Sequence, residues 1–243
     1  MVGIRTRKAV CFVIFIIMIF LLLGLDRGWT ESEQPHLIAP GGAEIDFVNN
    51  LTKCFGTDTK PVEAYWKNYS VEAYYLEYNR DNDMVQAHNK VRILQNIPVY
   101  RVVTCNDFLV ELKREFIKAE NEVKIVYDEN TSLTGDALEW DRQNDLVKVT
   151  GTPQIDFKDW RINGERIEGQ INKGIFIIFG PVKGIGNDES FQAGQVVFDH
   201  IRDKIFLKNN PVVIQGKNQF TAPEIVYDLN TRKISTKSDL RMN

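Results

Sequence analysis

The chain has 243 residues, of which 43% are hydrophobic and 26% charged, and its formal net charge is −3. This composition is that of a folded globular protein with one large or two small domains. The slight acidic excess, without a concentrated face of Lys and Arg, argues against nucleic acid as a partner.

The N-terminal segment is set apart from the rest of the chain. Residues 1–8 are basic, and the next 17 residues, Ala9–Leu25, contain no charge. A helix of this length is near the lower limit of about 17 residues for crossing a bilayer. It is slightly longer than the apolar core of a signal peptide, which is about 7–15 residues. We therefore predict an uncleaved transmembrane anchor over residues 9–25 with residues 1–8 in the cytoplasm, and a removed signal peptide is the alternative.

Residues 26–44 are rich in Gly, Pro and polar residues and have no apolar period, so they are expected to form a tether. Residues 45–243 are then the exported domain. Two cysteines of that domain, Cys54 and Cys105, lie where disulfides persist. A bridge between them and two free thiols both remain open, because a sequence contains no distances.

From about residue 45 onward, strand signals follow one another, and four stretches share one pattern. An aromatic residue closes a strand, a polar turn follows, and a β-branched residue stands seven places after the aromatic. These pairs are Tyr78 and Val85, Trp140 and Val147, Phe198 and Ile205, and Tyr227 and Ile234. The aromatic residues are 62, 58 and 29 positions apart. These intervals indicate a unit of about 30 residues with weaker copies between the clear ones.

The repeat predicts an all-β fold with an apolar interior. Alternate side chains of a strand point to one face, and a two-stranded unit cannot bury that face alone, so neighbouring units must stack. We therefore expect an elongated, open β-jellyroll or β-roll, preceded by the N-terminal transmembrane helix. The expected lining of its interior is Trp140, Val147, Val149, Ile155, Phe198, Ile205 and Leu207. Such residues are also what an ordinary core contains.

The last repeat ends without a proline or a helix to cover it. An unpaired edge strand invites pairing with another chain. The residues expected at this docking edge are Ile234, Thr236, Leu240 and Met242. A terminal strand paired only within its own sheet is the alternative.

The stretches Ala137–Ile155 and Glu224–Thr236 resemble the OstA-type repeat, in which an aromatic-Asp pair, a turn and an alternating apolar segment with a central Gly follow one another. That repeat builds the jellyroll of the bacterial lipopolysaccharide export proteins. The chain looks most like their inner-membrane-anchored LptC-type member rather than the soluble LptA-type. The Gly of the pattern is present at Gly151 and is replaced by Asn89, Asn209 and Ser238 in the other copies.

The resemblance implies a non-enzymatic component of the lipopolysaccharide export bridge. Such a protein binds the acyl chains of lipopolysaccharide in an apolar groove, receives them from an inner-membrane ABC transporter complex and passes them toward the outer membrane. It implies a single-pass inner-membrane protein with a periplasmic domain, and another jellyroll protein as a partner. The alternative is an anchored β-roll scaffold with a dry core that binds other envelope proteins or glycans.

Catalytic chemistry has little support in the sequence. The three histidines are far apart and no zinc-binding spacing is present, so neither a metal nor another cofactor is expected. Carboxylate pairs such as Asp141 with Asp145 and Asp199 with Asp203 could serve glycoside hydrolysis. They recur in the turns of the repeats, where Asp bonds to the backbone. The Gly-rich stretch Phe179–Ser190 is expected to be a loop between strands.

Overall fold

The computed structural model describes residues 35–67, 69–95, 101–236 and 241–242, which belong to one compact unit, Pro35–Asn243. The expected cytoplasmic segment 1–8 and transmembrane helix 9–25, residues 26–34 of the expected tether, and Leu240 lie outside the described residues. A search of the described residues finds no helix of sufficient length and apolar character to cross a bilayer.

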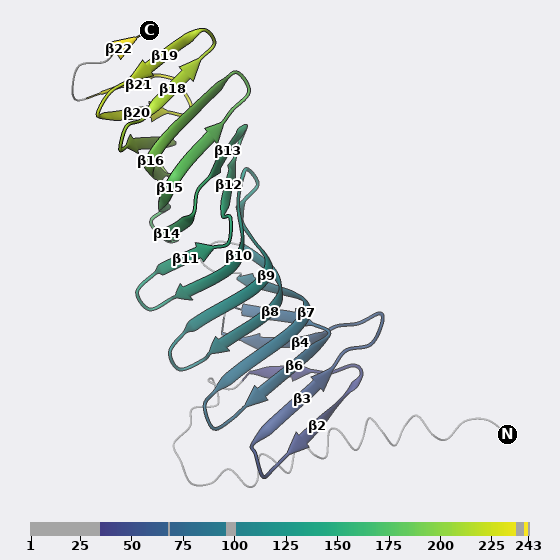
Figure 1. Ribbon diagram of the computed structural model, residues 1–243. Helices are drawn as coiled ribbons and strands as arrows, with labels where there is room; N and C mark the ends of the chain where they lie inside the picture. The colour runs from purple at the N-terminus through teal and green to yellow at the C-terminus, as the bar shows by residue number, and fades with distance from the viewer. Residues whose placement is uncertain (1–34, 68, 96–100, 237–240, 243) are drawn as a thin grey trace, which may run out of the picture. The chain divides into compact units, whose positions relative to one another are not determined.

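The described chain is all-β, which confirms the predicted fold class. It forms 22 strands that belong to a single hydrogen-bonded sheet, and every pairing in it is antiparallel. The strands are β1 (His36–Ile38), β2 (Gly42–Asp46), β3 (Leu51–Phe55), β4 (Val62–Trp66), β5 (Tyr69–Ala73), β6 (Tyr75–Asn79), β7 (Met84–Gln95), β8 (Arg101–Glu111), β9 (Phe116–Asp128), β10 (Thr131–Asp141), β11 (Leu146–Thr150), β12 (Gln154–Phe157), β13 (Trp160–Asn163), β14 (Arg166–Gln170), β15 (Ile175–Ile185), β16 (Glu189–Asp199), β17 (Lys204–Lys208), β18 (Val212–Gln215), β19 (Asn218–Thr221), β20 (Glu224–Asp228), β21 (Ile234–Ser235) and β22 (Arg241–Met242). Figure 1 shows them stacked in chain order, from β2 and β3 at one end to β19 and β22 at the other.

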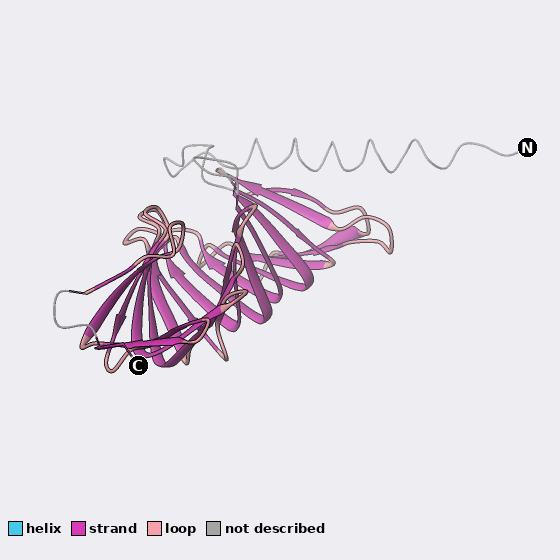
Figure 2. Ribbon diagram, turned by 90° about the horizontal axis from the view of Figure 1, so that it is seen from above, coloured by secondary structure: helices cyan, strands magenta, loops and turns pink. Residues whose placement is uncertain are grey.

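The sheet is divided along its length into two wings. Wing I contains β1, β4, β5, β12, β13, β18, β19 and β22, and wing II contains β2, β3, β6, β11, β14, β17, β20 and β21. The long strands β7, β8, β9, β10, β15 and β16 run through both wings. Figure 2, which views the stack from above, shows the strands one behind another with the connecting turns along the edges.

A recurring left-handed residue separates the wings. Asn89, Asn121, Gly151, Gly180 and Asn209 have φ angles of 65°, 63°, 77°, 93° and 61°. Glycine adopts this conformation without a steric penalty, and Asn tolerates it better than other residues. Register shifts at the same level place one extra residue on β7, β9 and β15, the strands that contain Asn89, Asn121 and Gly180, as expected for β-bulges that bend a sheet. The Gly position of the repeat is therefore a corner, which explains why Asn can replace it.

The expected loop Phe179–Ser190 is wrong except at residues 186–188, which lie between β15 and β16. β15 continues through this segment to Ile185, and Gly180 is one of the corners. Gly and Pro are common in loops, but in this fold they mark a bend within a paired strand.

The seven-residue spacing of the repeat is confirmed as a cross-strand pair. Tyr78 lies opposite Val85, Trp140 opposite Val147, Phe198 opposite Ile205 and Tyr227 opposite Ile234. The weaker copies also exist, with Val110 opposite Ile117 and Gly169 opposite Phe176. Each pair stands one residue before the end of a wing II hairpin, so these hairpins recur about every 30 residues.

The Asp residues of the repeat act in the turns. Asp141 accepts a hydrogen bond from the Asn144 backbone at 3.1 Å, and Asp199 accepts one from the Arg202 backbone at 3.0 Å. Asp228 accepts one from the Thr231 backbone at 2.8 Å. These bonds close the turns between wing II strands, as Asp commonly does.

The core lies between the two wings. Burial alternates along the strands, so that one face of each is buried and the other is partly or fully exposed, as in β11 and β17. All seven residues expected to line the interior are buried: Trp140, Val147, Val149, Ile155, Phe198, Ile205 and Leu207. Burial of such a side chain contributes about 1.5–3 kcal/mol, so the packed interior is the main stabilising feature of the stack.

The N-terminal boundary of the domain differs from the expected one at residue 45. β1 and β2 begin within the expected tether 26–44, and they pair with β4 and β3. At the other end, β21 pairs with β20 and β22 with β19. In the described part of the chain, β21 and β22 each have one neighbour and end the two wings.

The disulfide left open for Cys54 and Cys105 is not formed, because both cysteines are free and buried. Cys54 on β3 lies opposite Leu76 on β6, which lies opposite Ala87 on β7. Cys105 is on β8, the next strand of the ladder. Three strand spacings of about 4.8 Å separate the two thiols, whereas a bridge requires Cα atoms within about 7 Å.

Candidate functional site

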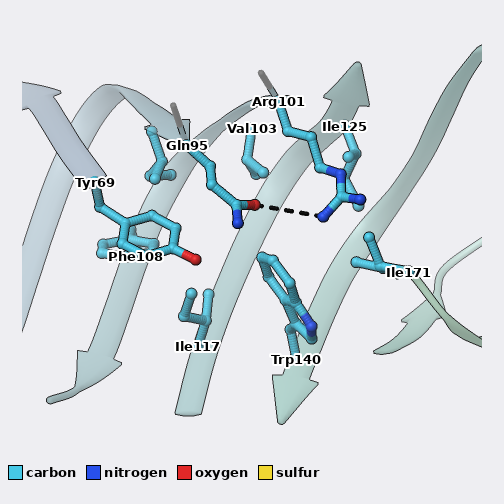
Figure 3. Close-up of a pocket in the computed structure, with 10 residues that line it drawn as sticks. Tyr69, Gln95, Arg101, Val103, Phe108, Ile117, Ile125, Trp140 and Ile171 are labelled. Atoms are coloured by element: carbon cyan, nitrogen blue, oxygen red, sulfur yellow. Dashed lines mark hydrogen bonds between the residues drawn. The ribbon is translucent and has the colours of Figure 1, made fainter. Parts of the chain in front are cut away.

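Two small cavities lie between the wings. The first has a volume of about 20 Å³ and is shown in Figure 3. Its lining is Tyr69, Ile93, Gln95, Arg101, Val103, Phe108, Ile117, Ile125, Trp140 and Ile171. The second cavity also has a volume of about 20 Å³ and is lined by Ile125, Tyr127, Thr131, Ser132, Leu133, Ile155, Ile171, Phe176 and Phe198. Because they share Ile125 and Ile171, the two cavities are neighbours along the stack.

Both cavities are small compared with a ligand-binding pocket. Each has room for about one water molecule, whereas a drug-sized ligand occupies about 300–1,000 Å³. Around these two cavities the described part of the interior is therefore nearly filled by its own side chains. A long apolar ligand enters there only if the wings separate.

The free edges of the two wings meet in a row of polar contacts that we call the seam. At its first level, Lys67 of the β4–β5 turn pairs with Glu115 of the β8–β9 turn at 2.6 Å. Further along, the Tyr127 hydroxyl donates to the Ile171 carbonyl at 2.8 Å. His200 Nε2 lies 2.9 Å from Asp128 Oδ2.

The seam continues toward the C-terminal end of the stack. Lys158 of the β12–β13 turn contacts Asp203 at 3.2 Å and Asn230 at 2.7 Å. Arg232 contacts Asp159 at 3.3 Å. Partly exposed ion pairs of this kind contribute only about 0–1 kcal/mol each. The apolar interior, rather than the seam, therefore supplies most of the free energy that keeps the wings together.

A positively charged cluster lies beside the first cavity. Arg101 begins β8, is only 4% exposed, and reaches across the seam to Asn172 Oδ1 at 3.4 Å. The Arg142 guanidinium lies 4.3 Å from the centre of the Tyr69 ring and pairs with Glu115 at 3.3 Å. The hydrogen bond from Lys67 is the main cause that lowers the pKa of Glu115.

Burial is the main cause that raises the pKa of Tyr69, which keeps its hydroxyl protonated and able to donate. Arg142 and Arg101 oppose this increase through their charges. Both arginines therefore contribute positive electrostatic potential at the Tyr69 hydroxyl.

Of the seven residues expected to line the interior, three line a cavity. Trp140 lines the first, and Ile155 and Phe198 line the second. The other four, Val147, Val149, Ile205 and Leu207, are buried in the core away from both cavities. Contact of any of them with a lipid remains a prediction.

Sequence reasoning missed the polar residues of the first cavity. Arg101 alternates with Val103 and Cys105, two buried residues of the same strand face. A charged residue at an inward-facing position of an alternating strand can be recognised from the sequence alone. Tyr69 and Ile171 carry no comparable signal, because only the meeting of the wings brings them to this cavity.

The expected docking residues lie at the C-terminal end of the stack where they are described. Ile234 on β21 lies opposite Tyr227, and the Thr236 hydroxyl donates to the Glu224 carbonyl at 2.8 Å. Met242 on β22 lies opposite Phe220. Docking of a partner at this end remains a prediction.

A groove of about 250 Å³ lies beside His88 and Asp107, whose side chains are 2.8 Å apart. Both are partly exposed, and the groove also contains Lys118 and Glu120. A search of the described ranges finds no group of three or more His, Cys, Asp or Glu residues suited to hold a metal ion.

No family description matches this sequence, and no curated protein matches it. Among solved structures, the chain is similar to that of LptH, the LptA-homologous periplasmic component of the conserved lipopolysaccharide transport device of Pseudomonas aeruginosa. The likeness covers 46% of this chain and 93% of LptH, at 15% sequence identity and a TM-score of 0.42. At these values it assigns neither a family nor an activity to the chain.

Proposed function

We propose that this chain is a non-enzymatic lipid-transfer protein of the bacterial cell envelope. Acyl chains of lipopolysaccharide bind between the two wings and pass along the stack. The proposal rests on the OstA-type repeats of the sequence together with the apolar interior that those repeats build.

One observation carries the proposal. Inward side chains from both wings form one continuous apolar cluster, which runs from Val62 and Leu76 to Ile225 and Leu229. An acyl chain has no hydrogen bonds to satisfy, so a continuous apolar path is sufficient to hold it. Each methylene removed from water contributes about 0.8 kcal/mol. Similar aliphatic residues along the path hold the chain with similar free energy at each level, which allows it to slide.

The closed interior implies that lipid binding and wing separation occur together. Separation in water would expose apolar surface at a cost of about 25 cal/mol per Å². An inserted acyl chain covers that same surface, so most of this cost is avoided when the ligand is present. The contacts of the seam, which are individually weak, are then the part of the closed state that must be broken.

The remaining parts of the proposal follow from the sequence. Residues 9–25 anchor the chain in the inner membrane as a single-pass helix, and the β domain lies in the periplasm. An inner-membrane ABC transporter complex supplies the lipid and the energy for its direction. Another jellyroll protein pairs with the C-terminal end strands at Ile234, Thr236, Leu240 and Met242.

The second candidate is an anchored scaffold with a dry core. The volume of the cavities, about 20 Å³ each, favours it, because an interior that never opens needs no larger space. Such a protein would bind other envelope proteins or glycans through its outer surface and its end strands.

Photo-crosslinking at adjacent positions of β9 separates the two candidates. Ile125 lines both cavities, whereas its neighbour Lys124 is exposed on the opposite face of the strand. A photoreactive residue is placed at each position in cells that make lipopolysaccharide. Lipid transfer predicts a lipopolysaccharide adduct at Ile125 that requires transporter ATP hydrolysis, and none at Lys124.

The same experiment at Phe198, which lines only the second cavity, tests whether the path is continuous. Val149 with its exposed neighbour Lys148 is a further matched pair on β11. A folded, well-expressed protein without any lipid adduct at Ile125, Phe198 and Val149 would establish the dry scaffold instead.

A further inference from the structure

Arg101 is a buried charge in the apolar interior. As the first residue of β8 it shares the inward face with Val103 and Cys105, and it is 4% exposed. A buried guanidinium loses the hydration that it has in water, and proteins normally offset this loss with a carboxylate or several strong hydrogen bonds.

The contacts that Arg101 makes are weak for a buried charge. Its Nη1 lies 3.5 Å from Gln95 Oε1 and 3.4 Å from Asn172 Oδ1, which are both neutral oxygens at the outer limit for a hydrogen bond. Its Nε is buried and has no hydrogen-bond partner among the described residues. The face of the guanidinium lies 4.8 Å from the centre of the Tyr127 ring. The adjoining segment 96–100 contains no acidic residue.

Two further donors without partners line the same cavity. The Tyr69 hydroxyl and the Trp140 indole nitrogen are buried, and neither has a hydrogen-bond partner among the described residues. Figure 3 shows Arg101 and Gln95 reaching into this space from above, Trp140 from below and Tyr69 from the left. Arg offers only donors and Trp offers only a donor, so this set matches a group that presents several acceptor oxygens.

Charge in this region also favours an anion. Lys67 and Arg142 share the single carboxylate of Glu115, at 2.6 Å and 3.3 Å. Arg101 is a further cation of this region, since its charge and that of Arg142 both act on the Tyr69 hydroxyl. In an apolar interior, where water does not screen charge, an oxyanion would be held more strongly than at the surface.

We propose that the first cavity binds the acidic group, a phosphate or a carboxylate, of an amphiphile, with Arg101 as its main ligand. The apolar chain of that amphiphile lies over Ile93, Val103, Ile117 and Ile125. Because the cavity is small, the ligand displaces the long contacts of Arg101 to Gln95 and Asn172 as the wings separate. This inference rests on the proposed function and adds to it the residue that recognises the polar part of the lipid.

The test compares amphiphiles that have the same alkyl chain length and differ in their polar head group. Diazirine-labelled dodecyl phosphate, dodecanoate and dodecanol are bound to the full-length chain, and the labelled peptides are mapped against ligand concentration. We expect the two acids to label the residues around the first cavity at about 10- to 100-fold lower concentration than the alcohol does. Arg101→Gln should remove this preference, and Arg101→Lys should keep part of it. Arg114→Gln, at an arginine whose side chain is 66% exposed, should leave it unchanged.

Other outcomes would overturn the inference in distinguishable ways. Equal labelling by acids and alcohol in the interior would refute the acid site and leave the lipid-transfer proposal standing. Competition by inorganic phosphate as strong as that by dodecyl phosphate would indicate a site for a free anion. If no amphiphile labels the interior, both proposals fail. Because Arg101→Gln removes a buried charge, its Tm should not fall; a lower Tm would show that Arg101 has a structural role only.

Discussion

Replacing Gly151 by alanine tests the corner that divides the two wings. Gly151 has a φ of +77°, and a Cβ at this position would lie 2.4 Å from the Cβ of Asp136 and 2.5 Å from its Cγ. Asp136 is the single residue of β10, between Gly135 and Ala137, that stands against the two bulged residues Asn121 and Glu122 of β9. The left-handed conformation costs about 1–2 kcal/mol for a residue other than glycine. The clash with the bulge adds about 1–3 kcal/mol, because the backbone must shift.

The expected loss of stability for Gly151→Ala is therefore about 2–5 kcal/mol. For a domain of this size each kcal/mol lowers Tm by about 2–4 °C, so Tm should fall by roughly 4–20 °C. Far-UV circular dichroism during thermal and urea unfolding measures both quantities. Asn209→Gly is the matched control at another corner, where φ is already +61°, and it should change stability by about 1 kcal/mol or less.

A second substitution separates the two contributions. At the Asn209 corner the facing residue is Gly194, whose added Cβ would lie 2.7 Å from that of Asn209, so each of these two corners pairs one glycine with one larger residue. Asp136→Gly should therefore relieve the clash in the Gly151→Ala background. A double-mutant cycle should give a coupling free energy of about 1–3 kcal/mol. Unchanged stability of Gly151→Ala, or zero coupling, would refute the corner geometry.

Two further predictions concern the turns and the thiols. The side-chain hydrogen bond from Asn144 lowers the pKa of Asp141, and the backbone hydrogen bond from Thr231 lowers that of Asp228. Since these pKa values are depressed in the folded state, their contribution to stability is present above about pH 4 and is lost as the pH falls through the folded values. The midpoint of urea unfolding should therefore decrease below that pH, and less so in a chain with Asp141→Asn and Asp228→Asn; equal decreases in both chains would contradict this. Burial raises the pKa of Cys105 to about 12 and also raises that of Cys54, so neither thiol should react with iodoacetamide at pH 8 until the chain is unfolded, as peptide mass spectrometry can show. Labelling of either in the native chain would show that the wings open in the absence of ligand.

The local periodicity of the sequence determined much of the fold. Alternation within strands, and the spacing of seven from Trp140 to Val147, depend only on neighbours along one hairpin. The same local reasoning indicated the inward face of Val149, Phe198 and Leu207 and the turn role of Asp141. The weaker copies at Val110 and Gly169 were expected as strands, but their residue types are too variable for sequence alone to align them.

The conformation of the corner was only partly encoded. The pattern marked Gly151, Asn89 and Asn209 as equivalent positions, and a shared left-handed φ explains that equivalence. The same logic fails at Gly180, where Gly and Pro predict a loop. A bend inside a paired strand and a loop between strands have the same local composition, and only the pairing of β15 with its neighbours distinguishes them.

The seam and the first cavity depend on tertiary structure alone. Lys67 and Glu115 are 48 positions apart, and Arg101 and Asn172 are 71 positions apart. Which hairpins of one wing meet those of the other depends on the bend at each corner and on sheet twist that accumulates over many strands. No short stretch of sequence encodes this combined bend and accumulated twist. The sequence by itself therefore determined the strands and their apolar face, and the tertiary structure decided which polar groups close the interior and meet inside it.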